Sequence, residues 1–311
     1  MAGKKIVIAG ALGYIGSALI DLYRDATDIE VLLVDRLFVP DRLANLPGHF
    51  RFIQSDIFDP SSIMDHVRNA DILYLLVAEV EAESSKDRET SVWRNNFEAC
   101  CNLVKTVDKK TRVVFTSSGN LFGGLKPGDN FENLTEKDTP CPKLPYAESK
   151  YAMESFLRKQ HPNHTIARLG TNFGYAPGVR FNLVTNIFTQ RMLMGRPILL
   201  HGGGKNFRPS VHVRDAAAAL KFIADRNDTI GEVYHVARHN LQICQLAERI
   251  AKYNPACRLE VVDKVVPFNS YQLSSDKLKS LGFNFAWDLE KGIEEMSRIF
   301  GVCQSTSPAI R

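Results

Sequence analysis

Near its N-terminus, at residues 4–16, the chain reads KKIVIAGALGYIG, a short apolar run that leads into three glycines spaced as GxxGxxG. A strand that passes through Gly10, Gly13 and Gly16 into a helix permits a tight turn and lets the backbone approach a pyrophosphate. The helix N-terminus then offers free N–H groups and the positive end of its dipole. The same pattern also fits a glycine-rich turn without a ligand, so its surroundings must distinguish the two interpretations.

The residues after the second and third apolar runs favour a dinucleotide. Asp35 lies about 20 residues beyond the glycines, where a carboxylate can bind the adenosine ribose hydroxyls. A carboxylate there would repel a 2′-phosphate, which favours NAD over NADP, although Arg36 follows directly and argues the other way. Asp56 and Ile57 follow the third run and are candidates to contact adenine. The alternative for Asp56 is a helix cap or turn residue.

Apolar runs alternate with helical patterns through the first half of the chain. Such alternation predicts an α/β fold with a parallel sheet buried on both faces. The expected strands are Lys4–Ala9, Glu30–Val34, Phe50–Gln54, Ile72–Val77, Arg112–Thr116, His164–Arg168 and Val233–Val236, and Tyr14–Arg24 is an expected helix. In the second half we expect loops at Gly170–Gly178 and Gly202–Pro209, and helices at Ala216–Ala224, Leu241–Lys252, Asp276–Leu281 and Leu289–Phe300.

Composition narrows the class of protein further. The 311 residues are 44% hydrophobic and 24% charged, as in soluble globular proteins. Lys and Arg exceed Asp and Glu by only 39 to 35, with no long basic run, so we expect no nucleic-acid partner. The longest apolar run, Ile72–Ala78, is far too short to span a membrane. Without a secretory signal or CxxC spacing, we expect a cytoplasmic protein with reduced cysteines and no metal site.

A YxxxK motif suggests acid–base chemistry. At helical spacing, Tyr146 and Lys150 lie on one face, and an ammonium beside a phenol lowers its pKa. The tyrosine could then exchange a proton with a substrate alcohol, while Lys150 could also hold the nicotinamide ribose. An isolated YxxxK also fits an ordinary surface helix. Ser118 ends the fifth expected strand, where it could bond a reacting hydroxyl or carbonyl, or simply cap a turn.

Together, and in this order and spacing, these elements resemble the extended short-chain dehydrogenase/reductases of the NAD-dependent epimerase/dehydratase family. Further similar segments begin at Asn96, at Arg168 with Asn172, at Arg208 with His212, and at Ser275 with Asp276 and Lys277. The resemblance implies a Rossmann-type, doubly wound parallel sheet with a smaller α/β C-terminal substrate domain. Residues 1–170 would form mainly the NAD-binding domain, with sheet contributions from later segments, and residues 171–311 mainly the interleaved substrate-binding domain.

The resemblance also implies roles for individual residues. The catalytic group would be Ser118, Tyr146 and Lys150. NAD would contact Gly10, Gly13, Tyr14, Ile15, Gly16, Asp35, Arg36, Asp56, Ile57, Leu76, Val77, Ala78, Asn96, Tyr146 and Lys150. A nucleotide-sugar would contact Ser118, Asn172 and Arg208, and a homodimer would form through helices near residues 95–107 and 146–159.

Departures from the family pattern bear on the reaction. Sugar 4,6-dehydratases of this family carry Thr-Asp-Glu at the serine element, whereas this chain has Ser118-Gly-Asn120, so we do not expect dehydration. Oxidation of a sugar carbon at C4, reduction of a keto-sugar, or both in sequence as in an epimerase remain open. Reduction of an unrelated ketone is a further alternative, while the intact catalytic group disfavours a dinucleotide sensor.

Glu79 places an unusual acid near the expected site, either against sugar hydroxyls or in a solvated loop. No arginine precedes the closing Asp276 within residues 265–275, which leaves Arg208, with Arg180, to bind the substrate anion.

Overall fold

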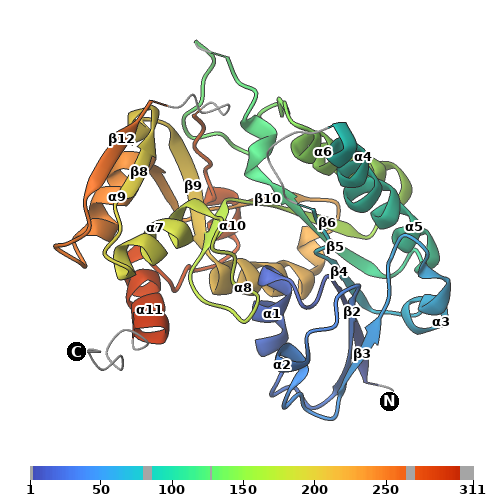
Figure 1. Cartoon of the computed structure of the whole chain (residues 1–311). Coiled ribbons are helices and arrows are strands. Elements are labelled where there is room, and N and C mark those ends of the chain that lie inside the picture. The colour runs from blue at the N-terminus through green and yellow to red at the C-terminus, as the bar shows by residue number, and fades with distance from the viewer. Residues whose placement is uncertain (1–2, 80–85, 127, 264–269, 302–311) are drawn as a thin grey trace.

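The computed structural model describes residues 3–79, 86–126, 128–263 and 270–301. Its main layer is a seven-stranded parallel sheet (Figure 1). The strand order is β10-β6-β5-β4-β1-β2-β3. The bounds are β1 Lys4–Ala9, β2 Ile29–Asp35, β3 Phe50–Gln54, β4 Ile72–Leu75, β5 Arg112–Ser118, β6 His164–Leu169 and β10 Val233–Val236. Every pairing is parallel, which confirms the predicted Rossmann-type α/β class.

Helices cover both faces of this sheet (Figure 1). Successive residues of β1 point to opposite faces, so Ile6 and Ile8 belong to one apolar core while Val7 and Ala9 belong to the other. The first core includes residues of α1 (Tyr14–Asp21), α8 (Val213–Ala224) and α10 (Asp276–Ser280). The second includes residues of α3 (Met64–Val67), α5 (Ala99–Thr106) and α6 (Pro145–Gln160). Burial of each strand on both faces explains why the runs read as continuously apolar.

A smaller α/β unit is built from the second half of the chain. It contains a three-stranded sheet in the order β11-β9-β7 and a two-stranded sheet of β12 and β8. The strands are β7 Thr171–Phe173, β8 Ile198–His201, β9 Phe207–His212, β11 His239–Gln242 and β12 Leu259–Val262, and the helices are α7 Val184–Leu193, α9 Ile243–Ala251 and α11 Leu289–Gly301. A third apolar core joins these helices to β8.

Shorter helical segments complete the described part of the chain. They are α2 Pro40–Leu43, α4 Lys86–Trp93, a π-helix η2 Arg94–Glu98, and the 3-10 helices η1 Pro60–Ser62, η3 Gly119–Phe122, η4 Gly202–Gly204 and η5 Asn227–Thr229. No helix within the described residues combines the length and the apolar character needed to cross a bilayer.

Two predicted loops and one predicted helix differ in the structure. The loops expected at Gly170–Gly178 and Gly202–Pro209 contain β7 and the first residues of β9. Strand β7 pairs in parallel with residues 210–212 of β9, and the first residues of β9 pair with β11. Each of these strands pairs with residues that lie far away in the sequence. The local Gly and Asn content therefore predicted loops instead of strands. The helix expected from Leu241 begins at Ile243, because Leu241 and Gln242 belong to β11. The other predicted helices and strands differ from the structure only in where they begin or end. For example, β4 ends at Leu75 and α1 ends at Asp21.

Candidate active site

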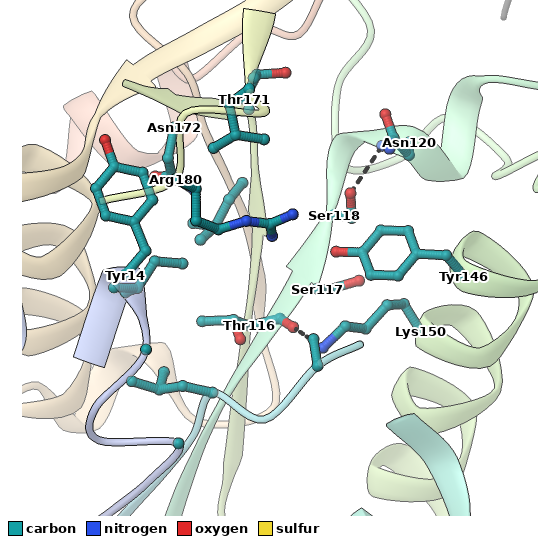
Figure 2. Close-up of a pocket in the computed structure, with 18 of the residues that line it drawn as sticks. Tyr14, Thr116, Ser117, Ser118, Asn120, Tyr146, Lys150, Thr171, Asn172 and Arg180 are labelled. Atoms are coloured by element: carbon teal, nitrogen blue, oxygen red, sulfur yellow. Dashed lines mark hydrogen bonds between the residues drawn. The ribbon is translucent and has the colours of Figure 1, made fainter. Parts of the chain in front are cut away.

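A cavity of about 230 Å³ lies at the carboxyl ends of the central strands (Figure 2). It is the place at which a doubly wound sheet binds ligands. The sequence-predicted residues that line it are Gly10, Gly13, Tyr14, Ile15, Leu76, Ala78, Ser118, Tyr146, Lys150, Asn172 and Arg180. We call this cavity, where the glycine loop meets the Ser-Tyr-Lys group, the reaction chamber.

Two glycines of the loop, Gly10 and Gly16, stand where a side chain would be strained or would not fit. Gly10 has φ +83°, a left-handed conformation that favours glycine. A Cβ on Gly16 would lie 2.4 Å from the carbonyl oxygen of Gly10. Helix α1 starts directly after Gly13 and has no side-chain cap, so its first N–H groups are left for a ligand. The loop therefore fits a pyrophosphate.

The residues expected around adenosine lie next to this loop, outside the chamber lining. The Asp35 carboxylate accepts hydrogen bonds from the backbone N–H groups of Leu12 (2.9 Å) and Leu37 (3.0 Å). Arg36 beside it is exposed. Arg42 also contacts the loop, because its guanidinium donates a hydrogen bond to the Leu12 carbonyl. The sequence did not predict this contact, since Arg42 belongs to no recognised motif.

Asp56 and Ile57 follow β3 at the same end of the sheet. The Asp56 carboxylate accepts a hydrogen bond from the backbone N–H of Phe58 at 2.9 Å, which is the turn geometry of the alternative interpretation. Ile57 is buried in the second apolar core. An adenine contact by these residues stays a prediction.

Asn96 and Glu79 bond to each other rather than line the chamber. Asn96, in the π-helix, is fully buried, and its amide accepts from the Glu79 N–H at 2.7 Å and donates to the Glu79 carbonyl at 3.0 Å. The Glu79 carboxylate accepts from Ser91 and Asn95. These contacts hold the segment after β4, which includes Leu76 and Ala78 of the chamber wall.

Tyr146 and Ser118 come together from two elements. Tyr146 is the second residue of α6, and Ser118 is the last residue of β5. Burial raises the pKa of Tyr146, while its hydrogen bond with Ser118 and the positive charge of Arg180 lower that pKa. Ser118 also accepts a hydrogen bond from the backbone N–H of Asn120 at 3.1 Å.

Lys150 is held by two backbone carbonyls that the sequence did not predict as partners. Its ammonium donates to the carbonyls of Thr116 (3.0 Å) and Val77 (3.3 Å), which direct it to the floor of the chamber. Burial lowers the pKa of Lys150 to about 8. Arg180 is a further cation whose positive charge lowers the pKa of the Tyr146 phenol, and the effect of Lys150 on that pKa stays a prediction.

A buried charged group anchors helix α6 behind these residues. Glu154 is fully buried and accepts a hydrogen bond from Ser117 at 2.6 Å. Its carboxylate also accepts two hydrogen bonds from Arg168, each 2.9 Å long. Because Ser117 precedes Ser118 and Glu154 follows Lys150 by one helical turn, this contact ties β5, β6 and α6 together.

A second cavity of about 470 Å³ adjoins the chamber and shares Asn120, Thr171 and Leu183 with it. We call it the adjoining cavity. Arg208 lines it, with its guanidinium 5.4 Å from the centre of the Tyr271 ring. Tyr271 donates a 2.6 Å hydrogen bond to the side-chain oxygen of Asn120. The sequence did not predict Tyr271 or Asn120 as site residues. For Asn120 its closeness to Ser118 in sequence was a possible signal, whereas no signal pointed to Tyr271.

The two cavities are rich in positive charge. Lys150 and Arg180 line the chamber, and Arg191 and Arg208 line the adjoining cavity. Among the described residues that line either cavity there is no Asp or Glu. The arrangement suits an anionic ligand that spans both.

The glycine loop is tied to the substrate side through Tyr14. Its hydroxyl donates to the Gly174 carbonyl and accepts from the Asn186 amide at 3.1 Å. Asn186 also accepts from the Gly174 N–H at 3.1 Å. A Cβ on Gly178 would lie 2.6 Å from the carbonyl oxygen of Gly13.

Comparisons with known proteins agree with this architecture. Low-salt glycan biosynthesis protein Agl12 of Haloferax volcanii is 26% identical over 307 residues, covering 93% of this chain and 96% of that protein. dTDP-glucose 4,6-dehydratase of Mycobacterium tuberculosis is 25% identical over 277 residues, covering 84% and 82%. The structure of UDP-glucose 4-epimerase from Thermotoga maritima matches with a TM-score of 0.81 at 21% identity, covering 96% and 99%, which indicates a shared fold.

A family model settles the classification. The model described as "NAD dependent epimerase/dehydratase family" matches residues 6–237, well over half of the chain. The NAD dependence of that family agrees with the cofactor expected from the glycine loop and Asp35. The chain belongs to the NAD-dependent epimerase/dehydratase family.

Proposed function

We propose that the protein is an NAD-dependent epimerase that acts at C4 of a nucleotide-linked sugar. The observation that carries this proposal is the reaction chamber, where Ser118, Tyr146 and Lys150 meet the glycine loop and no described lining residue is a carboxylate. The adjoining cavity gives the rest of a nucleotide-sugar a place to bind.

The chain's own residues would divide the chemistry as follows. Ser118 bonds the reacting hydroxyl and orients it toward the Tyr146 oxygen, which takes the hydroxyl proton and later returns it. Bound NAD supplies a reversible hydride acceptor. Lys150 is buried below Tyr146 and holds the nicotinamide ribose. In an epimerase, the keto-sugar turns over between the two proton transfers of Tyr146.

Binding roles follow the two cavities. The glycines of the loop and Tyr14 would hold the NAD pyrophosphate, and Asp35 would hold the adenosine ribose. Arg208 and Asn172 would bind the substrate. The Asn172 side-chain oxygen is buried without a hydrogen-bond partner among the described residues, as expected of a group that awaits a ligand.

Dehydration is the main competitor, because one relative above is a 4,6-dehydratase. Elimination needs an acid and a base beside the sugar. Gly119 and Asn120 follow Ser118 here and provide neither group. A one-way oxidase or keto-sugar reductase would use the same residues as an epimerase and is distinguished by its product.

The assembly and the location of the protein are part of the same proposal. A homodimer through the helices that contain residues 95–107 and 146–159 follows from the family resemblance. A cytoplasmic location fits a reduced-cysteine protein that uses NAD.

The test is product analysis with purified protein and NAD. UDP-, dTDP- and GDP-glucose are incubated separately, and the sugars are identified by NMR. A C4 epimer supports the proposal, a stable 4-keto-sugar with NADH indicates a one-way oxidase, and a 6-deoxy methyl signal would identify a dehydratase. Tyr146→Phe is the control, since it should abolish each reaction while NAD still binds.

A further inference from the structure

A single peptide group links the glycine loop to helix α11. Its carbonyl belongs to Gly174 and accepts a hydrogen bond from the Tyr14 hydroxyl. Its N–H belongs to Tyr175 and donates to the Glu295 carboxylate at 3.3 Å. The C=O and the N–H of a trans peptide point in opposite directions, so Tyr14 and Glu295 hold its two ends. We call it the 174–175 peptide group.

Gly174 leaves the direction of this peptide group open. Its φ is +90°, a left-handed conformation, and glycine adopts other conformations as readily. Rotation of the 174–175 peptide group would turn the carbonyl away from Tyr14 while the chain on either side stays in place. Glu295 opposes that rotation, because a carboxylate accepts hydrogen bonds from the N–H end and donates none.

Glu295 is held in the ionised form that this contact needs. It is 5% exposed, and its Oε1 lies 2.7 Å from the Arg214 guanidinium. Its Oε2 lies 3.4 Å from Nε2 of His212. Nδ1 of His212 accepts from the backbone N–H of Arg214 at 3.2 Å, so the neutral ring carries its proton on Nε2, towards the carboxylate. Although burial alone would raise the pKa of Glu295, His212 and Arg214 lower it below its usual value.

Close packing keeps the carboxylate in this position. The His212 ring stacks on Trp287 with ring centres 4.3 Å apart. A Cβ on Gly174 would lie 1.9 Å from Nε2 of His212, and a Cβ on Gly292 of α11 would lie 3.1 Å from Cδ2 of the same ring. The His212 ring therefore packs against both α11 and the 174–175 peptide group, beside Glu295.

Tyr14, at the other end of the peptide group, is the first residue of α1 and lines the reaction chamber (Figure 2). Burial raises the pKa of Tyr14, so its hydroxyl keeps its proton and donates it to the Gly174 carbonyl. The following segment also contacts α1, since the Gly178 N–H donates to Ser17 at 3.0 Å. A loop that is already held in its binding conformation loses less conformational freedom when a ligand binds, which tightens binding.

We propose that Glu295 is a positioning residue for NAD, which fixes the 174–175 peptide group and thereby holds Tyr14 and the start of α1 in place for the pyrophosphate. The inference rests on the proposed function, because it takes the glycine loop as the NAD site. Glu295 is not among the described residues that line either cavity, so it acts through this peptide group and not by touching the reactants.

The test is a double-mutant cycle in which NAD affinity of the apoprotein is measured by calorimetry. Tyr14→Phe removes the hydroxyl, Glu295→Met removes the carboxylate at similar side-chain volume, and a third protein carries both changes. Each single change should weaken NAD binding by about fivefold to 20-fold, the size of one lost hydrogen bond. Because both act on one peptide group, the double variant should bind at most about twofold more weakly than the weaker single variant.

Two further variants separate positioning from stability. Glu295→Gln keeps an oxygen for the Tyr175 N–H and should recover most of the NAD affinity that Glu295→Met loses. Glu294→Ala, at an exposed position of α11, is the matched control and should leave NAD affinity unchanged. Arg214 is 41% exposed, so the changes at Glu295 leave no fully buried cation unpaired, and urea unfolding verifies that each variant is folded. If Glu295→Met does not fold, Glu295→Gln replaces it in the cycle, with an expected loss of about twofold to fivefold.

Three results would overturn the inference. Unchanged NAD affinity in folded Glu295→Met would leave Glu295 with a structural role only. Losses that multiply in the double variant would show that Tyr14 and Glu295 act separately, and an equal loss in Glu294→Ala would show a general effect of α11. The unmodified protein tests the proposed function by itself: if it binds no NAD, that function fails, whereas normal NAD binding in every variant rejects the role of Glu295 alone.

Discussion

Replacing Lys150 with methionine should stabilise the apoprotein at neutral pH while it removes activity. Lys150 is only 1% exposed, and burial lowers its pKa from 10.5 to about 8. That difference corresponds to about 3 kcal/mol of penalty on the charged form in the folded state. Methionine removes the penalty but leaves the carbonyls of Thr116 and Val77 without this donor, so the net gain in unfolding free energy should be about 1–3 kcal/mol.

The pH dependence identifies the cause. Between pH 8 and 10.5 the unfolded chain still binds the Lys150 proton while the folded protein has released it. The unmodified protein therefore gains stability with rising pH relative to the variant. The advantage of Lys150→Met should be full below pH 8 and should fall by about 3 kcal/mol as pH approaches 10.5, where it vanishes or reverses because the lost donor contacts remain.

The assay is urea unfolding of both proteins without NAD, from about pH 7 to about pH 10. Lys137→Met, at an exposed position, is the matched control and should show no such trend. A variant that is less stable than the parent at pH 7, or one whose gain does not change with pH, would refute the reasoning.

Three further substitutions test the geometry of the site. Gly16→Ala places a methyl 2.4 Å from the Gly10 carbonyl, and should cost about 1–3 kcal/mol of unfolding free energy and weaken NAD binding in a fluorescence titration. Glu154→Gln leaves Arg168 buried without its counter-charge, and should cost about 3–5 kcal/mol in urea unfolding; a loss below 1 kcal/mol would contradict the anchoring role of this ion pair. Tyr146→Phe should lower kcat at least about 100-fold with unchanged NAD affinity, and retained activity would remove Tyr146 from the mechanism.

The local pattern of apolar residues was sufficient to predict the strands of the main sheet. Its strands are buried on both faces, so each reads as an apolar run whose ends fall within two residues of the structure, as at β1 and β5. The small sheet was missed at β7 and β9 because short, partly polar strands depend on distant partners. No periodicity within Gly170–Gly178 records a pairing with residues 210–212.

For the candidate site, motif and fold placed the loop and the Ser-Tyr-Lys group in one cavity. The direction in which each side chain points could not be predicted from the sequence. The spacing of Tyr146 and Lys150 predicted that they share a helix face. It could not predict the two backbone carbonyls that also hold the Lys150 ammonium. Arg180 reaches Tyr146 from a segment that is distant in sequence, and Asn96 bonds the backbone of Glu79.

The contact of Gly178 with the Gly13 backbone, and the bonds of Tyr14 to Gly174 and Asn186, limit how such a chain can be re-engineered. The C-terminal unit is not an interchangeable module, because its first segment is fitted to the glycine turn that we propose holds the cofactor. A chimera that imports a relative's residues 171–311 would need glycine at position 178 and the Asn186 amide to keep that turn in place. Grafts of new specificity should instead begin after Asn186, with the inherited segment before it left with the nucleotide-binding half.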